Sequence, residues 1–222
     1  MHLLWLISVA AGVCYFLTDP WHPFPGSIVL KALSVAPLAL IAWKSRLDSP
    51  AKHLLTAALA LSSLGDILLD SKPSFFVFGL GAFLLAHLLY VRLFFDNRRR
   101  GQALGRIRWA LVALLALFSM GFSFSLIPVL GDLTLPVLMY IGVLTAMVFS
   151  AIAWRTRRTD WILYGAFLFL ISDAVLGAAK FRGPVPLRGW IVWGTYYAAQ
   201  FMITKGVLRE LGPQSSLKSE DR

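Results

Sequence analysis

The sequence predicts an all-α integral membrane protein, and two observations carry that prediction. The chain is 58% hydrophobic but only 14% charged, whereas a soluble domain is usually about 45–50% apolar and about 25% charged. The apolar residues also gather in runs of about 20, the length of helix that spans a ~30 Å hydrocarbon core. We therefore expect eight transmembrane helices, forming a single domain over residues 1–211.

The first four apolar runs predict helices at residues 3–18, 27–43, 53–70 and 74–95. The first run lacks the basic n-region of a signal peptide, so we interpret it as a retained span. The second contains Lys31 near its start, which either snorkels to the interface or faces the bundle interior as a cation. It also contains Pro37, which a membrane helix tolerates when neighbouring groups satisfy the freed carbonyl.

The second four apolar runs predict helices at residues 109–127, 133–154, 160–179 and 189–209. The polar tail at 212–222 is expected to be a disordered cytoplasmic segment, because it holds too little apolar surface to form a core. A count of eight spans returns the chain to its starting side, so both termini are expected on one side of the membrane.

The distribution of basic residues predicts the orientation. Most of the 21 lysines and arginines fall in the loops and tail on the side of the termini, whereas the opposite loops hold Lys72, Lys180, Arg182 and Arg188. The positive-inside rule therefore places both termini in the cytoplasm. The net charge of +10 indicates topology and contact with anionic lipids, not nucleic acid. We expect a bacterial inner membrane protein, and the oligomeric state stays open.

Two aspartates lie deep in apolar runs and are the first candidates for function. Asp66 and Asp173 stand in the last third of their runs, where a charge costs ~3 kcal/mol at the bilayer centre and is a functional hypothesis by default. They are 107 residues apart, as are Tyr90 and Tyr197. This spacing indicates two parallel four-helix repeats, with a chance match as the alternative. Asp70, one turn after Asp66, is expected at the interface in contact with water.

Other polar side chains within the spans are expected to converge with the two acids on one interior cavity, because each unsatisfied polar group costs several kcal/mol in hydrocarbon. These residues are Lys31, His87, Tyr90, Tyr196, Tyr197 and Gln200. The alternative, favoured for Tyr90 and Gln200, is that they join helices by hydrogen bonds. Two carboxyl groups in one low-dielectric cavity repel each other when both are ionised. That repulsion favours one protonated acid beside one carboxylate, the arrangement for general acid–base catalysis.

Several other kinds of site have no support in the sequence. There is no G-x-S-x-G, no glycine-rich phosphate loop, and no H-E-x-x-H or H-x-x-x-H spacing. A metal held by Asp66, Asp173 and His87 is the less favoured alternative, and we predict no metal. Cys14 is the one cysteine, which rules out a disulfide within the chain, and we expect it to act as a small core hydrophobe.

At these polar residues the chain resembles the YhhN family of multi-pass membrane proteins, whose animal members are lysoplasmalogenases. The resemblance covers essentially the whole chain and rests on Gly65-Asp66, Ala86-His87-x-x-Tyr90, Ser172-Asp173 and Tyr196-Tyr197-Ala198-Ala199-Gln200. The position of Lys31 also fits. The family's lysine is usually followed closely by proline, whereas here Ala32 follows and proline waits until Pro37.

The resemblance implies hydrolysis of the vinyl ether bond of lysoplasmalogens, or of a related enol-ether lysolipid, without an organic cofactor. The products would be a fatty aldehyde and glycerophosphoethanolamine or glycerophosphocholine. Asp66 and Asp173 would form the acid–base pair, with their individual roles open. His87, Tyr197 and Gln200 would orient the water or the glycerol oxygens, and Lys31 or Lys180 would meet the lipid phosphate.

Two other functions fit the same residues. Parallel repeats with acids at depth also occur in proton-coupled carriers, so a transporter or flippase of a lipid or small amphiphile is the main alternative. Gly65 and Gly177 flank the acids, as in the broken helices of carriers, but no proline interrupts either run. A structural or partner-binding role is the third possibility, and it predicts that both aspartates tolerate replacement by asparagine.

Overall fold

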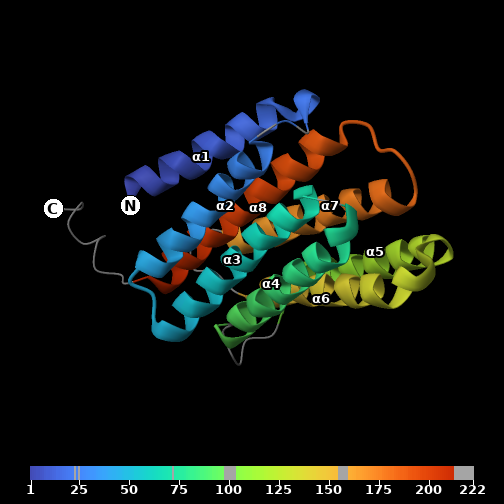
Figure 1. Cartoon of the computed structure of the whole chain (residues 1–222). Coiled ribbons are helices and arrows are strands. Elements are labelled where there is room, and N and C mark those ends of the chain that lie inside the picture. The colour runs from blue at the N-terminus through green and yellow to red at the C-terminus, as the bar shows by residue number, and fades with distance from the viewer. Residues whose placement is uncertain (23, 25, 72, 98–103, 155–159, 213–222) are drawn as a thin grey trace.

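The chain folds as an all-helical bundle in the computed structural model, which describes residues 1–22, 24, 26–71, 73–97, 104–154 and 160–212 (Figure 1). Its helices are α1 (His2–Leu17), α2 (Ser27–Lys44), α3 (Ser49–Ser71), α4 (Phe76–Asp96), α5 (Arg106–Leu130), α6 (Thr134–Ala153), α7 (Trp161–Phe181) and α8 (Arg188–Leu211). These described residues contain no strand. The tail predicted to be disordered lies, from residue 213 onward, outside them.

The apolar character of the helices confirms the predicted class of fold. In the described part of the chain, five segments are long and apolar enough to cross a membrane, and one of them, Arg106–Ala153, contains both α5 and α6. The 16-residue α1 is a shorter apolar helix. Helix α8 is outside this set and carries Lys205 and Arg209 on its second half. That each of α1 to α8 crosses the membrane stays a prediction.

Successive helices run in opposite directions, so the loops gather at two ends of the bundle (Figure 1). The start of α1 and the end of α8 lie at one end. The connections from α1 to α2, α3 to α4, α5 to α6 and α7 to α8 lie at the other, which we call the loop end. Helix α8 packs on α7, α2 and α1, and α4 packs on α3 and α6. Of the two helices that carry the acids, α3 therefore packs on α4, and α7 packs on α8.

Small residues bring α7 and α8 close together, as membrane helices require in the absence of a hydrophobic force between them. A Cβ atom added at Gly165 on α7 would lie 3.0 Å from the carbonyl oxygen of Ala199 on α8. Phe169, one turn further along α7, is fully buried. Cys14 differs from the prediction, because its side chain is exposed on the outer face of α1; the core side of α1 is taken by smaller or hydrogen-bonded residues such as Ser8 and Gly12.

Helix α5 is held to the bundle by an arginine at each end. Arg108, at its start, donates to the carbonyl oxygens of Ile152 and Trp154 and pairs with Asp160 at 3.0 Å. Arg182, just after α7, donates to the carbonyl oxygen of Ser125 at 2.5 Å. The contacts of Arg108 satisfy carbonyls at the end of α6, which a helix leaves without internal partners. The two arginines fix the two ends of α5, while its middle borders the cavity described below.

Candidate active site

A cavity of about 430 Å³ lies inside the bundle and reaches its loop end. Both predicted acids, Asp66 and Asp173, line it. The helices divide its wall into two kinds of surface. Polar side chains come mainly from α1, α2, α3, α8 and the connection between α1 and α2: Tyr15, His22, Lys31, Asp70 and Tyr196. Apolar side chains come mainly from α5, α6 and α7: Phe118, Phe122, Leu126, Ile141, Leu144 and Leu170.

Asp66 on α3 has two partners that stabilise a negative charge. Its side chain is almost fully buried, with 2% of the residue exposed. The hydroxyl of Tyr196 on α8 donates to Oδ2 at 2.6 Å, and Nζ of Lys31 on α2 lies 3.7 Å from Oδ1. A cation and a hydroxyl donor both favour the carboxylate over the neutral acid. Asp66 is thus equipped to act as an anion within the cavity.

Lys31 points into the bundle, so the alternative in which it snorkels to the interface is wrong. Its Nζ lies 2.8 Å from Oδ1 of Asp70, whose Oδ2 accepts a hydrogen bond from Tyr15 at 2.9 Å. Nζ also lies 5.7 Å from the ring centre of Tyr15 and 5.8 Å from that of Trp193. Asp70, expected at the interface in water, is instead a second counter-ion of Lys31. The reason is geometric, because residues four apart on α3 share the face that meets α2.

Asp173 on α7 has different neighbours. The hydroxyl of Tyr140 on α6 donates to Oδ2 at 2.5 Å, and Nε2 of His87 on α4 lies 3.8 Å from the same oxygen. Nδ1 of His87 lies 2.6 Å from the carbonyl oxygen of Phe83, which can only accept, so Nδ1 carries the hydrogen. In the neutral ring Nε2 is then an acceptor. It faces Asp173 and has no hydrogen-bond partner among the described residues, and a neutral Asp173 would supply a proton toward it.

Tyr90 and Gln200 lie behind the cavity wall and support Tyr196. The Tyr90 hydroxyl donates to Oε1 of Gln200 at 2.6 Å, and Nε2 of Gln200 donates to the Tyr196 hydroxyl at 3.4 Å. Tyr90 and Gln200 are fully buried and do not line the cavity. The interhelical hydrogen bond favoured for this pair is therefore present. Through Tyr196 it is also connected to the Asp66 carboxylate.

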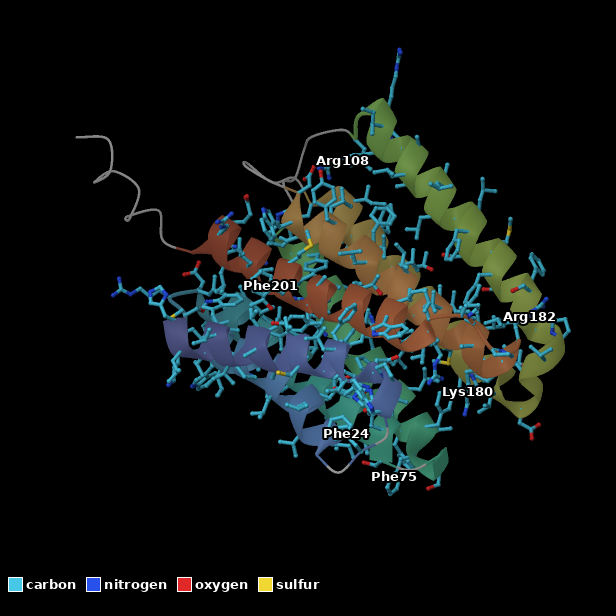
Figure 2. All side chains as sticks on the ribbon, turned by 90° about the horizontal axis from the view of Figure 1, so that it is seen from above. Phe24, Phe75, Arg108, Lys180, Arg182 and Phe201 are labelled. Atoms are coloured by element: carbon cyan, nitrogen blue, oxygen red, sulfur yellow. The ribbon has the colours of Figure 1, made fainter. Side chains whose placement is uncertain are left out.

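The last two candidates lie apart from the acids. Tyr197 is on another face of α8: its hydroxyl is 3.0 Å from Oγ of Ser8, and its ring stacks on that of Trp193 at 6.0 Å. Lys180 lines the cavity near the loop end, with its Nζ 4.7 Å from the ring centre of Phe76. Figure 2 shows Lys180 at the same end of the bundle as Phe75. Of the predicted residues, the structure thus brings Lys31, Asp66, Asp173, Tyr196 and Lys180 to one cavity.

Sequence reasoning missed Tyr140 and Tyr15, the two hydroxyl donors that bind Asp173 and Asp70. Each stands alone in an apolar run, where tyrosine is also a common interfacial residue. The one available signal was the cost of burying a phenol hydroxyl without a partner, and this signal does not name the partner. The described residues include no group of three or more His, Cys, Asp or Glu side chains that could hold a metal ion. That the protein needs no metal stays a prediction.

The fold and the cavity define a multi-pass membrane protein with an internal, acid-lined chamber. The model of the YhhN family matches residues 26–207, so the chain belongs to the YhhN family. No solved structure matches it.

Curated relatives share most of the chain. It is 34% identical to a lysoplasmalogenase of Mycobacterium bovis, over 91% of this chain and 82% of the relative. It is 35% identical to human lysoplasmalogenase TMEM86B, over 95% of this chain and 87% of the relative. It is also 28% identical to an uncharacterized membrane protein YhhN of Escherichia coli, over 81% of this chain and 86% of the relative.

Proposed function

We propose that this protein is a hydrolase that cleaves the vinyl ether bond of lysoplasmalogens, or of a related enol-ether lysolipid. The products are a fatty aldehyde and glycerophosphoethanolamine or glycerophosphocholine. The observation that carries the proposal is the pair of carboxyl groups, Asp66 and Asp173, on one cavity with polar and apolar walls. The similarity to proteins named lysoplasmalogenase supports the choice of substrate.

The unlike partners of the two acids support unlike roles. Lys31 and Tyr196 favour the carboxylate form of Asp66. No cation side chain among the described residues forms an ion pair with Asp173 other than His87, whose Nε2 acts as an acceptor when the ring is neutral. We therefore assign Asp173 as the general acid and Asp66 as the general base. Carboxyl pairs whose environments differ in this way are a recurring basis of acid–base catalysis.

The reaction begins with transfer of a proton from the Asp173 carboxyl to the β-carbon of the vinyl ether. The C=C electron pair forms the new C–H bond, and an oxocarbenium ion results, which the Asp66 carboxylate stabilises. Asp66 then takes a proton from water as the water oxygen bonds to the cationic carbon, giving a hemiacetal. The hemiacetal hydroxyl returns a proton to Asp173, Asp66 protonates the glycerol oxygen, and the C–O bond breaks. Both acids end in their starting states.

The hydroxyl donors and the histidine hold the acids in place for these steps. Tyr196 fixes Oδ2 of Asp66, whose Oδ1 faces Lys31, and Tyr140 fixes Oδ2 of Asp173. Between turnovers Nε2 of His87 shares the proton of Asp173, which Asp173 then gives to the substrate when the reaction begins. Proton transfer by positioned groups of this kind contributes about 10²- to 10⁴-fold in rate.

The proposal is tested on purified protein in detergent, with lysoplasmenylethanolamine as substrate and its saturated alkyl-ether analogue as control. We expect free aldehyde from the vinyl ether only, and a loss of at least about 100-fold in rate in both Asp66→Asn and Asp173→Asn. Turnover near the wild-type rate in either folded variant would contradict the assigned pair. Absence of aldehyde from every vinyl ether lipid tested, with well-folded protein, would contradict the hydrolase.

A proton-coupled transporter or flippase is the alternative, and one feature of the site favours it. Each acid has one partner on the helix before it, Lys31 on α2 or Tyr140 on α6. Each has a second partner on the fourth helix of the other half, Tyr196 on α8 or His87 on α4. This relation supports the two parallel repeats that carriers often use. Proton-dependent movement of lipid in liposomes, with the lipid unchanged, would support the transporter.

We further propose that α1 to α8 all cross the bacterial inner membrane, with both termini in the cytoplasm. The distribution of lysines and arginines supports this orientation through the positive-inside rule. The two ends of the bundle seen in Figure 1, with the start of α1 and the end of α8 at the same end, agree with an even number of crossings. The loop end and the mouth of the cavity would then lie on the side of the membrane opposite to the cytoplasm.

A further inference from the structure

We infer that the hydrocarbon chain of the substrate binds between α5, α6 and α7, and that it enters this part of the cavity sideways from the bilayer through an opening between α5 and α7. The identity of the ligand as a single-chain lysolipid rests on the proposed function. The evidence for the opening is the geometry of α5 and α7. The inference gives a binding role to residues outside the acid pair.

The two acids stand where the polar and apolar parts of the cavity meet. Beyond Asp173, the wall is formed by Phe118 on α5, Leu144 on α6 and Leu170 on α7. On the side of Asp66 the wall carries Lys31 and Asp70. A vinyl ether bond joins a polar glycerol to an apolar chain, so an amphiphile that puts this bond at the acids puts its chain along α5. Pockets lined in this way orient a ligand by its apolar part and fix it by a few polar groups.

The apolar part of the cavity is open toward the outside of the bundle. Phe118 on α5 lines the cavity and is nevertheless 41% exposed. Its ring is stacked on that of Phe122 at a centroid distance of 5.8 Å and an interplanar angle of 7°. An exposed apolar opening is costly in water but is compatible with lipid chains as the surrounding solvent.

Helix α7 presents a glycine to this opening. Gly177 lines the cavity, and a Cβ atom added there would lie 3.6 Å from the Phe122 ring, which is ordinary contact distance. The absence of a side chain at Gly177 therefore leaves room for roughly one methyl group before α5 and α7 touch. Arg182 holds α5 at Ser125, about one turn from Phe122, so the spacing of α5 and α7 beside Gly177 is fixed.

The loop end of the cavity suits the head group. Lys180 and Arg188 line the cavity there and are exposed, so they can meet a phosphate without losing their hydration. Partial burial lowers the pKa of His22 at the same mouth, so its ring stays neutral at neutral pH and the positive charge comes from the lysine and the arginine. A lipid bound with its phosphate at the loop end and its chain toward Leu144 keeps the orientation of a lipid in the adjacent leaflet, with the head group at the membrane surface and the chain toward the bilayer centre.

The test uses the full chain in detergent with a non-cleavable alkyl-ether lysophosphatidylethanolamine that carries a photoreactive diazirine at the end of its chain. We expect crosslinks on α5 and α7, around Phe118 and Leu170, because both line the cavity on the side of Asp173 away from Lys180. The variant Gly177→Phe fills the opening and should reduce crosslinking at least about fivefold and raise KM for a long-chain vinyl ether about tenfold, with a smaller change for a short-chain one. Gly177→Ala should stay within about twofold of the parent, because the methyl group fits.

A second phenylalanine variant controls for the bulk of the added ring. Leu117 is 63% exposed on α5 and does not line the cavity, so Leu117→Phe should leave crosslinking and KM unchanged. Crosslinks on α1 or α2, or an unchanged KM in a folded Gly177→Phe, would overturn the opening even if aldehyde is released. Crosslinks on α5 and α7 that Gly177→Phe removes would support it even if no aldehyde is released, and in that case the hydrolase alone would fail.

Discussion

The hydroxyl of Tyr196 on α8 donates a hydrogen bond of 2.6 Å to Oδ2 of Asp66 on α3. This bond joins residues 130 positions apart and connects the two halves of the chain at one acid. Behind it, Gln200 and Tyr90 continue the hydrogen bonds into the core. The Asp66 carboxylate is therefore held by a connected, buried network whose members restrict one another.

The first prediction concerns this bond. Tyr196→Phe keeps the ring and removes the donor, and a hydrogen bond to a charged group is worth about 1.5–3 kcal/mol. We expect kcat for aldehyde release to fall about 10- to 100-fold, with a small loss of thermal stability. The matched control is Tyr197→Phe, the next residue of α8, whose hydroxyl faces Ser8. Equal losses in the two variants would show that the hydroxyl on Asp66 has no special part in turnover.

The second prediction concerns His87. In His87→Gln the side chain can still accept a hydrogen bond from Asp173, but it cannot hold a proton. If Nε2 shares the proton of Asp173 between turnovers, kcat should fall about 100-fold while KM changes little. The measurement is steady-state aldehyde release together with thermal stability in detergent. A variant with kcat within about twofold of the parent would remove His87 from the proposed proton path. His87 would then be a packing residue against Phe169, with the two ring centres 4.7 Å apart.

The third prediction concerns the charges around Lys31. Lys31→Met leaves Asp66 and Asp70 without their cation, and breaking a buried ion pair costs about 3 kcal/mol at the lower end of the measured range. We expect a lower melting temperature in detergent. Adding Asp70→Asn removes one of the two uncompensated charges, so the double variant should be more stable than Lys31→Met alone. A double variant less stable than either single one would contradict the pairing of Lys31 with Asp70 at 2.8 Å.

Much of this fold follows from the sequence because membrane spans are long and apolar. The predicted range 27–43 matches α2 (Ser27–Lys44) closely, while α3 begins at Ser49 instead of 53. The difference arises because Lys52 and His53 are polar and lower the local hydropathy, although the backbone is already helical there. The four-residue spacing of Asp66 and Asp70 also predicted that the two side chains share one face of the helix.

The pairing between helices could not be predicted in the same way. Which tyrosine meets which acid depends on how the helices rotate and pack, and hydropathy carries no information on either. The sequence therefore offered Tyr90 and Tyr197 as repeat-related candidates, whereas the bonds to the acids come from Tyr196 and Tyr140. The role of Asp70 as the nearer counter-ion of Lys31 was missed for the same reason, since Asp70 meets Lys31 only through the packing of α2 on α3.

The fourth prediction concerns Gly65, next to Asp66 on α3. A Cβ atom there would lie 2.6 Å from Cδ2 of Phe83. The Phe83 ring is buried and packs edge-on against Tyr196, with the ring centres 5.8 Å apart. Gly65→Ala should therefore destabilise the protein by about 1–3 kcal/mol through overpacking and lower kcat by displacing Tyr196. Gly142→Ala on α6 is the control, because nothing lies within 4 Å of its added Cβ. It should be neutral or stabilising, by up to about 1 kcal/mol; a neutral Gly65→Ala would show that α3 and α4 separate easily.

The fifth prediction concerns the orientation of the bundle. The chain has one cysteine, so Cys14→Ser gives a background in which a single new cysteine reports its own side of the membrane. Asp132, between α5 and α6 at the loop end, and Ser49, at the start of α3, are both exposed. In intact cells a membrane-impermeant maleimide should label Asp132→Cys, and should label Ser49→Cys only after the membrane is opened. The reverse pattern would place the cavity mouth, with Lys180 and Arg188, in the cytoplasm, and the substrate would then come from the inner leaflet.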